Sequence, residues 1–196
     1  MTDDLSNLGL EFSEDWVPFP AAGSVDLDSW AKQQGAELAE RYAQDGAQGD
    51  ARRLARSLKR TAADCYTRDP LAAFGWYVSG QETAAAVMEL DAIHPDETFP
   101  EVTLDLLVEH MSGHDFGEPD VREVRLPLGD AVRIRQNLIG EKKGFFGPRP
   151  VIHTVFYGVC PDGMETALTM LVSWTEPILD EPAEQMADNI AKTFSL

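Results

Sequence analysis

The sequence is poor in cysteine and in basic residues, and it has no long hydrophobic run. Its two cysteines, Cys65 and Cys160, lie 95 positions apart in 196 residues. A disulfide framework is therefore excluded; one bridge is possible, but two reduced thiols are the prediction. Lysine and arginine number 16 against 34 aspartate and glutamate, and the formal net charge is -18. Such a charge disfavours nucleic acid and anionic membranes as partners of the whole surface.

From the sequence we predict no targeting or membrane-anchoring segment. No apolar run approaches the roughly 20 residues that a membrane helix needs. The first residues, MTDDLSNLGLEF, are acidic and contain neither a basic start nor a long apolar stretch. No secretory signal is therefore predicted, and a cytoplasmic location is expected. Because 43% of the residues are hydrophobic and 26% are charged, we predict a single globular domain at 8–196 after a tail at 1–7.

Sequence signatures of catalysis are missing as well. The chain contains no G-x-S-x-G, no G-x-x-x-x-G-K-[ST] and no G-x-G-x-x-G. Cys65 falls on the apolar stripe of a predicted helix, and Cys160 ends a predicted strand. Neither is expected at a helix amino terminus, where the pKa of a thiol is lowered. No cofactor is predicted, and the sequence favours a binding function over an enzymatic one.

Two helices are predicted in the first third of the chain, after a short edge strand within LEFSEDWVPFP (10–20). The first helix lies in residues 25–47, with Asp26 or Asp28 as its N-cap. The second lies in residues 51–66, with Asp50 as its N-cap and with its arginines and Lys59 facing solvent. The apolar residues on one side of each helix are Trp30, Leu38 and Tyr42 in the first, and Leu54, Leu58, Ala62 and Cys65 in the second.

The rest of the chain alternates between strands and helices. A hairpin is predicted at 71–80 and 83–93, and a helix at 99–113 with Pro100 in its first turn. Four strands are predicted at 121–127, 130–139, 150–160 and 164–174. The closing helix, 180–196, has Met186, Ile190 and Phe194 on its apolar face. The expected fold class is α+β, a mainly antiparallel β-sheet packed against helices.

This order of elements resembles the Mog1/PsbP-like group of α/β/α sandwiches. The likeness covers most of the chain: the opening FSEDWVPFP, a helical insertion, a run of hairpins, and the closing ADNIAKTFSL after TMLVSWTEP. The long helical pair at 26–66 departs from the simplest form of that pattern. The group has no catalytic fingerprint, and the resemblance implies an interaction module without assigning a role to any residue.

Histidines give weak candidates for a metal site. His110 and His114 are four positions apart, and on an intact helix both imidazoles would lie on one face. Gly113 lies between them and is predicted to end the helix, so the expected role of His110 is that of a last-turn residue. We therefore predict no metal site. His153, in the strand VIHTVFYGV, is expected to be a hydrogen-bonded core residue.

Positive charge gathers in one part of this acidic chain. Residues 121–150 carry seven basic residues and three acidic ones, a net charge of +4, so the remaining residues sum to -22. The segment ends in GEKKGFFGPRP (140–150), a glycine-rich loop whose tip is expected to be solvent-accessible. The predicted partner-binding residues of the basic sheet face and this loop are Arg125, Arg133, Arg135, Lys142, Lys143, Phe145, Phe146 and Arg149.

The register of the two strands decides how the arginines lie. A three-residue turn at 128–130 would pair Leu126 with Val132 and Val124 with Ile134. On the opposite face the same register would pair Arg125 with Arg133 and Glu123 with Arg135. Facing arginines need an anion, and the sequence leaves two sources open: an outside partner, or acidic helices of the same molecule lying over that face.

Two classes of function remain. The first is a non-catalytic protein-binding module that meets a partner with an acidic surface through the basic sheet face and the 140–150 loop. The second is a small-ligand-binding protein or enzyme with a cavity between the sheet and the 26–66 helices, in which His153 or Tyr157 makes polar contacts. Neither nucleic acid nor a membrane is an expected partner.

Overall fold

The computed structural model describes residues 8–140 and 149–196. These residues form seven strands, four α-helices and a short 3-10 helix (Pro177–Leu179), and the strands and α-helices follow the predicted order. The chain is α+β, with a mainly antiparallel sheet packed against helices. None of the helices in this part of the chain is long and apolar enough to cross a membrane.

The chain groups into two units, which are described separately. The N-terminal unit is Ser13–Glu89, and the C-terminal unit is Met1–Phe12 together with Leu90–Leu196. The strand β3 (Ala86–Ile93) begins in the first unit and ends in the second. A single domain over residues 8–196 stays a prediction.

The N-terminal unit pairs two short strands with two helices. β1 (Trp16–Pro18) and β2 (Ala72–Trp76) are antiparallel, and β2 is followed in the sheet by β3. α1 (Leu27–Gln44) begins after Asp26, whose carboxylate accepts a hydrogen bond from the Ser29 amide at 2.8 Å. α2 (Ala51–Cys65) begins after Asp50, whose carboxylate accepts from the first two arginine amides of the helix. Both predicted N-caps are confirmed, because short acidic side chains satisfy amides that lack a partner in the first turn.

The core of this unit is the apolar stripe predicted for each helix. Leu54, Leu58, Ala62 and Cys65 are fully buried on α2, and they pack with Leu38 and Tyr42 of α1. The helices approach closely at Gly35, where an added Cβ would lie 2.6 Å from the Ala51 carbonyl oxygen. Both cysteines are free thiols, as predicted, and burial raises the pKa of Cys65 to about 12.

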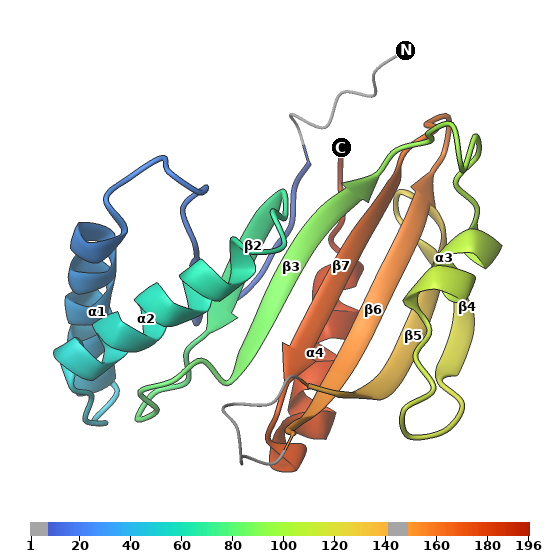
Figure 1. Cartoon of the computed structure of the whole chain (residues 1–196). Coiled ribbons are helices and arrows are strands. Elements are labelled where there is room, and N and C mark those ends of the chain that lie inside the picture. The colour runs from blue at the N-terminus through green and yellow to red at the C-terminus, as the bar shows by residue number, and fades with distance from the viewer. Residues whose placement is uncertain (1–7, 141–148) are drawn as a thin grey trace. The chain divides into compact units, whose positions relative to one another are not determined.

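The C-terminal unit is a sheet with a helix on each face (Figure 1). Its strands follow the order β3-β7-β6-β5-β4. The strands are β4 (Asp120–Leu126), β5 (Gly129–Ile139), β6 (Val151–Pro161) and β7 (Ala167–Trp174). α3 (Leu104–Met111) packs on Val132, Ile134 and Phe156, whereas α4 (Asp180–Ala191) covers the other face. A bridge between Gly9 and Ser195 joins the start of the chain to its end.

Two helix boundaries differ from the predictions. α3 begins at Leu104 rather than near Pro100, because the Thr103 hydroxyl accepts from the Leu106 amide and caps the helix there. α4 ends at Ala191, so Phe194 is buried from the turn that follows and does not belong to the helix face. The buried side of α4 consists of Ala183, Ala187, Ile190 and Ala191.

The predicted register of β4 and β5 is wrong. Leu126 pairs with Gly129 across a two-residue loop, and Val124 pairs with Ala131. Gly129 is the first residue of β5 and not part of the turn. Only glycine fits there, because a Cβ would collide with the Cys160 carbonyl of β6. The predicted glycine turn is therefore a point of close approach between β5 and β6. Arg125 lies opposite Asp130, and the residue opposite Arg133 is Arg122.

The burial of Phe194 predicts a large loss of stability on truncation. Its side chain is 2% exposed, and Phe194→Ala should lower the free energy of unfolding by about 3–5 kcal/mol. Phe116→Ala is the matched control, because Phe116 is 55% exposed and should change the stability by less than about 0.5 kcal/mol. Urea unfolding of both variants measures the difference; equal midpoints would contradict the docked carboxyl-terminal segment.

Candidate functional site

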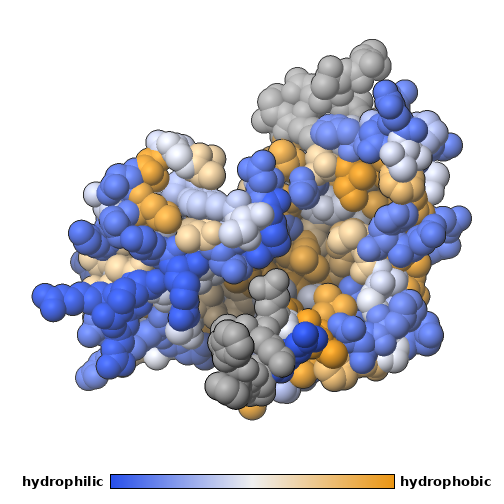
Figure 2. Space-filling view, viewed as in Figure 1, coloured by the Kyte–Doolittle hydropathy of each residue, from blue (hydrophilic) through white to orange (hydrophobic). Residues whose placement is uncertain are grey.

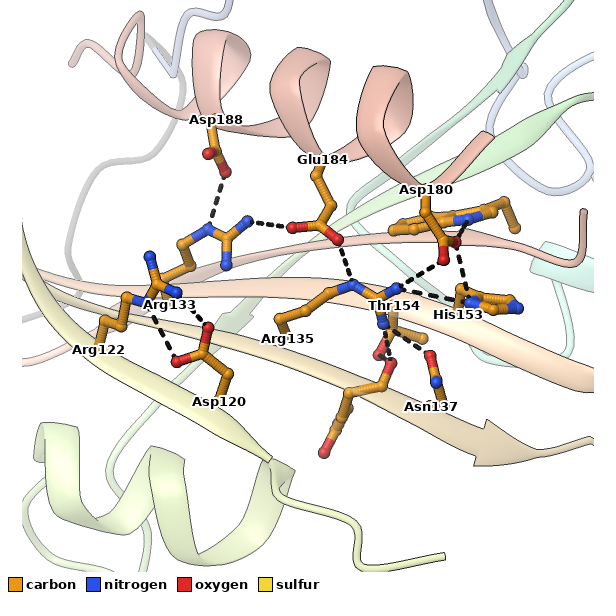
Figure 3. A network of polar contacts seen from close by, with 12 residues as sticks. Asp120, Arg122, Arg133, Arg135, Asn137, His153, Thr154, Asp180, Glu184 and Asp188 are labelled. Carbon is orange, nitrogen blue, oxygen red and sulfur yellow. Dashed lines mark hydrogen bonds and ion pairs between the residues drawn. The ribbon is translucent and has the colours of Figure 1, made fainter. Parts of the chain in front are cut away.

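Arg133 and Arg135 lie on the face of β5 that α4 covers. Successive side chains of a strand alternate between faces, so residues two apart share one. α4 carries carboxylates at Asp180, Glu184 and Asp188, a spacing of four that places them on one side of the helix. The two arginines therefore face a row of acids (Figure 3).

Arg133 is held by two of these acids. Its Nε donates to Asp188 at 2.8 Å and an amino group donates to Glu184 at 3.0 Å, while its side chain is 8% exposed. Burial by itself would lower the pKa of Arg133, but the hydrogen bonds to Asp188 and Glu184 outweigh it and raise that pKa. Tyr157 donates to the same Asp188 carboxylate at 2.6 Å. Burial, and then this hydrogen bond, raise the pKa of Tyr157 above its ordinary value.

Arg135, 15% exposed, belongs to a second cluster centred on Asp180. Its Nε donates to Glu184 at 2.6 Å, and its guanidinium carbon lies 5.1 Å from the centre of the Trp174 ring. The Asp180 carboxylate accepts from the Trp174 indole at 2.7 Å and lies 3.0 Å from His153 Nδ1. As expected from sequence, His153 is a buried, hydrogen-bonded residue of β6 beside Asp180 (Figure 3). Its ring stacks on that of Trp174.

The sequence left two sources of anions open for the arginines, an outside partner or acidic helices of the same molecule. For Arg133 and Arg135 the source is the same molecule. Both are paired by carboxylates of α4 in the same molecule. His153 and Tyr157, the polar contacts of the alternative function, also bind α4 through Asp180 and Asp188. A role for the arginines in an outside contact stays a prediction.

The other predicted partner-binding residues are not gathered in one place. Arg125 lies on the opposite face of the sheet from Arg133, and it pairs with Asp130 and Asp162 in exposed ion pairs. Arg149 is exposed just before β6, at the end of β5 far from Arg125. Lys142, Lys143, Phe145 and Phe146 lie outside the described residues.

The two weak metal candidates have different neighbours. His110 lies in the last turn of α3, with its Nδ1 3.0 Å from the Leu106 carbonyl and its ring edge-on to Phe99. His114 lies beyond the end of α3, 3.4 Å from Glu118. Among residues 8–140 and 149–196 no group of three or more metal-ligating side chains is assembled.

A basic surface is present instead on α2. The helix exposes five basic side chains on the side opposite its buried stripe, and its single acid, Asp64, lies in the last turn. We call this surface the α2 basic face, and it comprises Arg52, Arg53, Arg56, Lys59 and Arg60. Figure 2 shows hydrophilic side chains over this helix.

Few carboxylates of the same molecule neutralise the α2 basic face. Arg53 pairs with Glu82 and Lys59 with Asp28, and both pairs are exposed. Within the described part of the chain, no carboxylate forms an ion pair with Arg52, Arg56 or Arg60. The face therefore offers guanidinium groups, which bind carboxylates in a planar, two-point geometry.

The charge order along α2 opposes the stability of the helix. The amino-terminal end of a helix carries a partial positive charge, which favours acids in the first turn and bases in the last. Apart from its N-cap Asp50, α2 has the reverse order, with Arg52 and Arg53 in its first turn and Asp64 in its last. This order is less favourable to the helix than acids in the first turn and bases in the last would be.

The sequence contains a signal for this surface, although the sequence analysis predicts only that these side chains face solvent. Arg52, Arg56 and Arg60 recur every four residues with no acid between them, which is unusual in a chain of net charge -18. The 121–150 segment has the larger local count, and that count does not reveal which arginines the fold buries.

The buried pairs under α4 and the exposed pairs of β4 should differ in strength. Asp188→Asn leaves the buried Arg133 with one carboxylate and should lower the free energy of unfolding by roughly 2–3 kcal/mol, since Asp188 is itself partly exposed. Asp120→Asn makes the same change in the exposed pair with Arg122, where about 0–1 kcal/mol is expected. Urea unfolding at neutral pH measures both, and equal losses would show that burial does not distinguish the pairs.

Comparison with known proteins assigns neither a family nor a function to the chain. No protein-family model matches the chain, and no curated protein matches it with significant similarity. The likeness to the Mog1/PsbP-like group therefore stays a prediction, and the functional argument depends on the geometry of the chain itself.

Proposed function

We propose that the chain is a non-catalytic protein-binding module, of the interaction type that the Mog1/PsbP-like resemblance implies. The observation that carries the proposal is the α2 basic face, an exposed row of five cations on an acidic chain. This replaces the sheet face as the main contact surface, because Arg133 and Arg135 are held under α4. Arg125 and Arg149 are exposed but lie outside this face.

The proposed partner is a protein with an acidic surface. Arg52, Arg56 and Arg60 can donate hydrogen bonds to carboxylates without first breaking an ion pair of the described structure. The two existing pairs, at Arg53 and Lys59, are exposed, and such pairs contribute about 0–1 kcal/mol, so a partner's carboxylates can replace Glu82 and Asp28 at little cost. The strongly negative net charge argues against nucleic acid as the partner.

Charge reversal on α2 should separate binding from stability. The triple variant Arg52→Glu, Arg56→Glu and Arg60→Glu should lose binding to a fluorescent ten-residue glutamate-rich peptide, the probe for an acidic surface. Binding by the unmodified chain should weaken by about tenfold or more between about 50 and about 200 mM salt. Arg52→Glu alone should raise the free energy of unfolding by about 0.3–1 kcal/mol, because it places an acid in the first turn.

Arg149→Glu is the matched control, since it makes the same change at an exposed arginine outside α2. It should leave peptide binding nearly unchanged. Equal binding by the unmodified chain and the triple variant would refute the proposed surface. Tighter binding to a DNA duplex than to the peptide would refute a protein partner.

Small-ligand binding is a second candidate, favoured by one hollow in the N-terminal unit. It has a volume of about 240 Å³ and lies between Phe19 and Pro20 near the end of β1 and Tyr66 at the end of α2. Tyr66 donates to the Pro20 carbonyl at 2.7 Å, and Leu71 is exposed at the rim. This candidate predicts a retained mass in the native mass spectrum that disappears on denaturation; identical masses in both states would leave it without support.

A further inference from the structure

β4 is an edge strand with an exposed row of side chains. In the strand order of the described residues it is last, with β5 as its neighbour. Asp120, Val121, Arg122, Glu123 and Arg125 are all exposed. An edge strand presents unpaired amides and carbonyls to any strand that can align with it.

The hairpin fixes which backbone groups point outward. Leu126 and Gly129 close a two-residue loop, so they form the hydrogen-bonded pair nearest the turn. Counting back by two, the backbone groups of Arg122 and Val124 face β5. Those of Val121, Glu123 and Arg125 face away from it.

The sequence of β4 consists of two triplets with the same pattern. Asp120-Val121-Arg122 and Glu123-Val124-Arg125 each read acid, valine, arginine. Placed antiparallel against its own copy about the valine, such a triplet pairs acid with arginine at both ends and valine with valine in the centre. Opposite charges and apolar pairs directly across two strands are stabilising.

Two-fold axes at the charged residues between the valines are unfavourable. An axis at Arg122 would place two arginines opposite each other, and an axis at Glu123 would do the same with two glutamates. Like charges directly opposite are destabilising. Of the two valines, Val121 is 39% exposed and has outward backbone groups, whereas Val124 is already partly buried.

We propose that β4 pairs antiparallel with β4 of a second copy of this chain, about a two-fold axis at Val121. The pairing joins the two C-terminal sheets edge to edge. Each Arg122 leaves Asp120 of its own strand, to which it is now bound in an exposed pair, for Asp120 of the second copy. The proposal concerns a different surface from the α2 basic face and does not depend on it.

A hollow beside Asp120 supports this exchange. It has a volume of about 320 Å³, and its lining includes the acidic residues Glu118, Asp120 and Glu184. Arg135, which also lines it, is already bound by Glu184. The hollow therefore offers acceptors to an incoming cation, and Arg122 of the second copy would arrive opposite Asp120 at its edge.

Sedimentation velocity across a concentration series tests the pairing. The unmodified chain should form a dimer. Asp120→Arg places arginine against arginine and should weaken dimerisation at least tenfold, whereas Asp120→Arg with Arg122→Asp restores the complementary pattern and should restore the dimer. A chain that stays monomeric at every concentration, or a dimer that Asp120→Arg leaves unchanged, overturns the proposal.

Cysteine substitution tests the register. Residues on the two-fold axis in a hydrogen-bonded pair have Cα atoms about 5.5 Å apart, which suits a disulfide. Val121→Cys should therefore form a disulfide-linked dimer on mild oxidation. Val124→Cys is the matched control, with the same native thiols, and should not form one. Cross-linking at position 124 instead of 121 would overturn the proposed axis.

Discussion

The burial of two guanidinium groups beneath α4 constrains the rest of the C-terminal unit. A charge removed from water is costly unless carboxylates accompany it, so the helix must present acids toward β5. Asp180, Glu184 and Asp188 do so, and their spacing fixes the rotation of α4 about its axis. With that rotation set, Ala183 and Ala187 face the sheet, and small side chains let the helix approach it closely.

The arginines of this chain fall into two groups, those buried in ion pairs within the fold and those exposed to solvent. Arg133 and Arg135 lose solvent but gain two or more hydrogen bonds each, so turning their acids to a partner would leave buried guanidinium groups unmatched. On α2 the arginines keep their solvent, and the helix loses stability from the order of its charges. A contact site needs groups that are available without such a loss, and for this reason the proposed site lies on α2.

Local signals predicted the N-terminal unit well and the charged face poorly. The caps at Asp26 and Asp50 and the stripe from Leu54 to Cys65 depend on neighbours a few residues away, so the sequence predicted both helices. The partners of Arg133 lie some fifty residues further along the chain, and no local pattern reveals them. Gly129 misled the register, because close packing against β6 and a turn require the same residue type.

The acidity of the whole chain would give the proposed contact through α2 its selectivity. Screening limits attraction between exposed charges to about 8 Å at physiological ionic strength, so each basic patch acts on what lies directly against it. An acidic partner that approaches elsewhere on a surface of net charge -18 meets like charge and is repelled. In the proposed complex, repulsion over most of the surface and attraction at one helix would together restrict the orientation of binding. The excess of acids would thus be what makes a single basic helix specific.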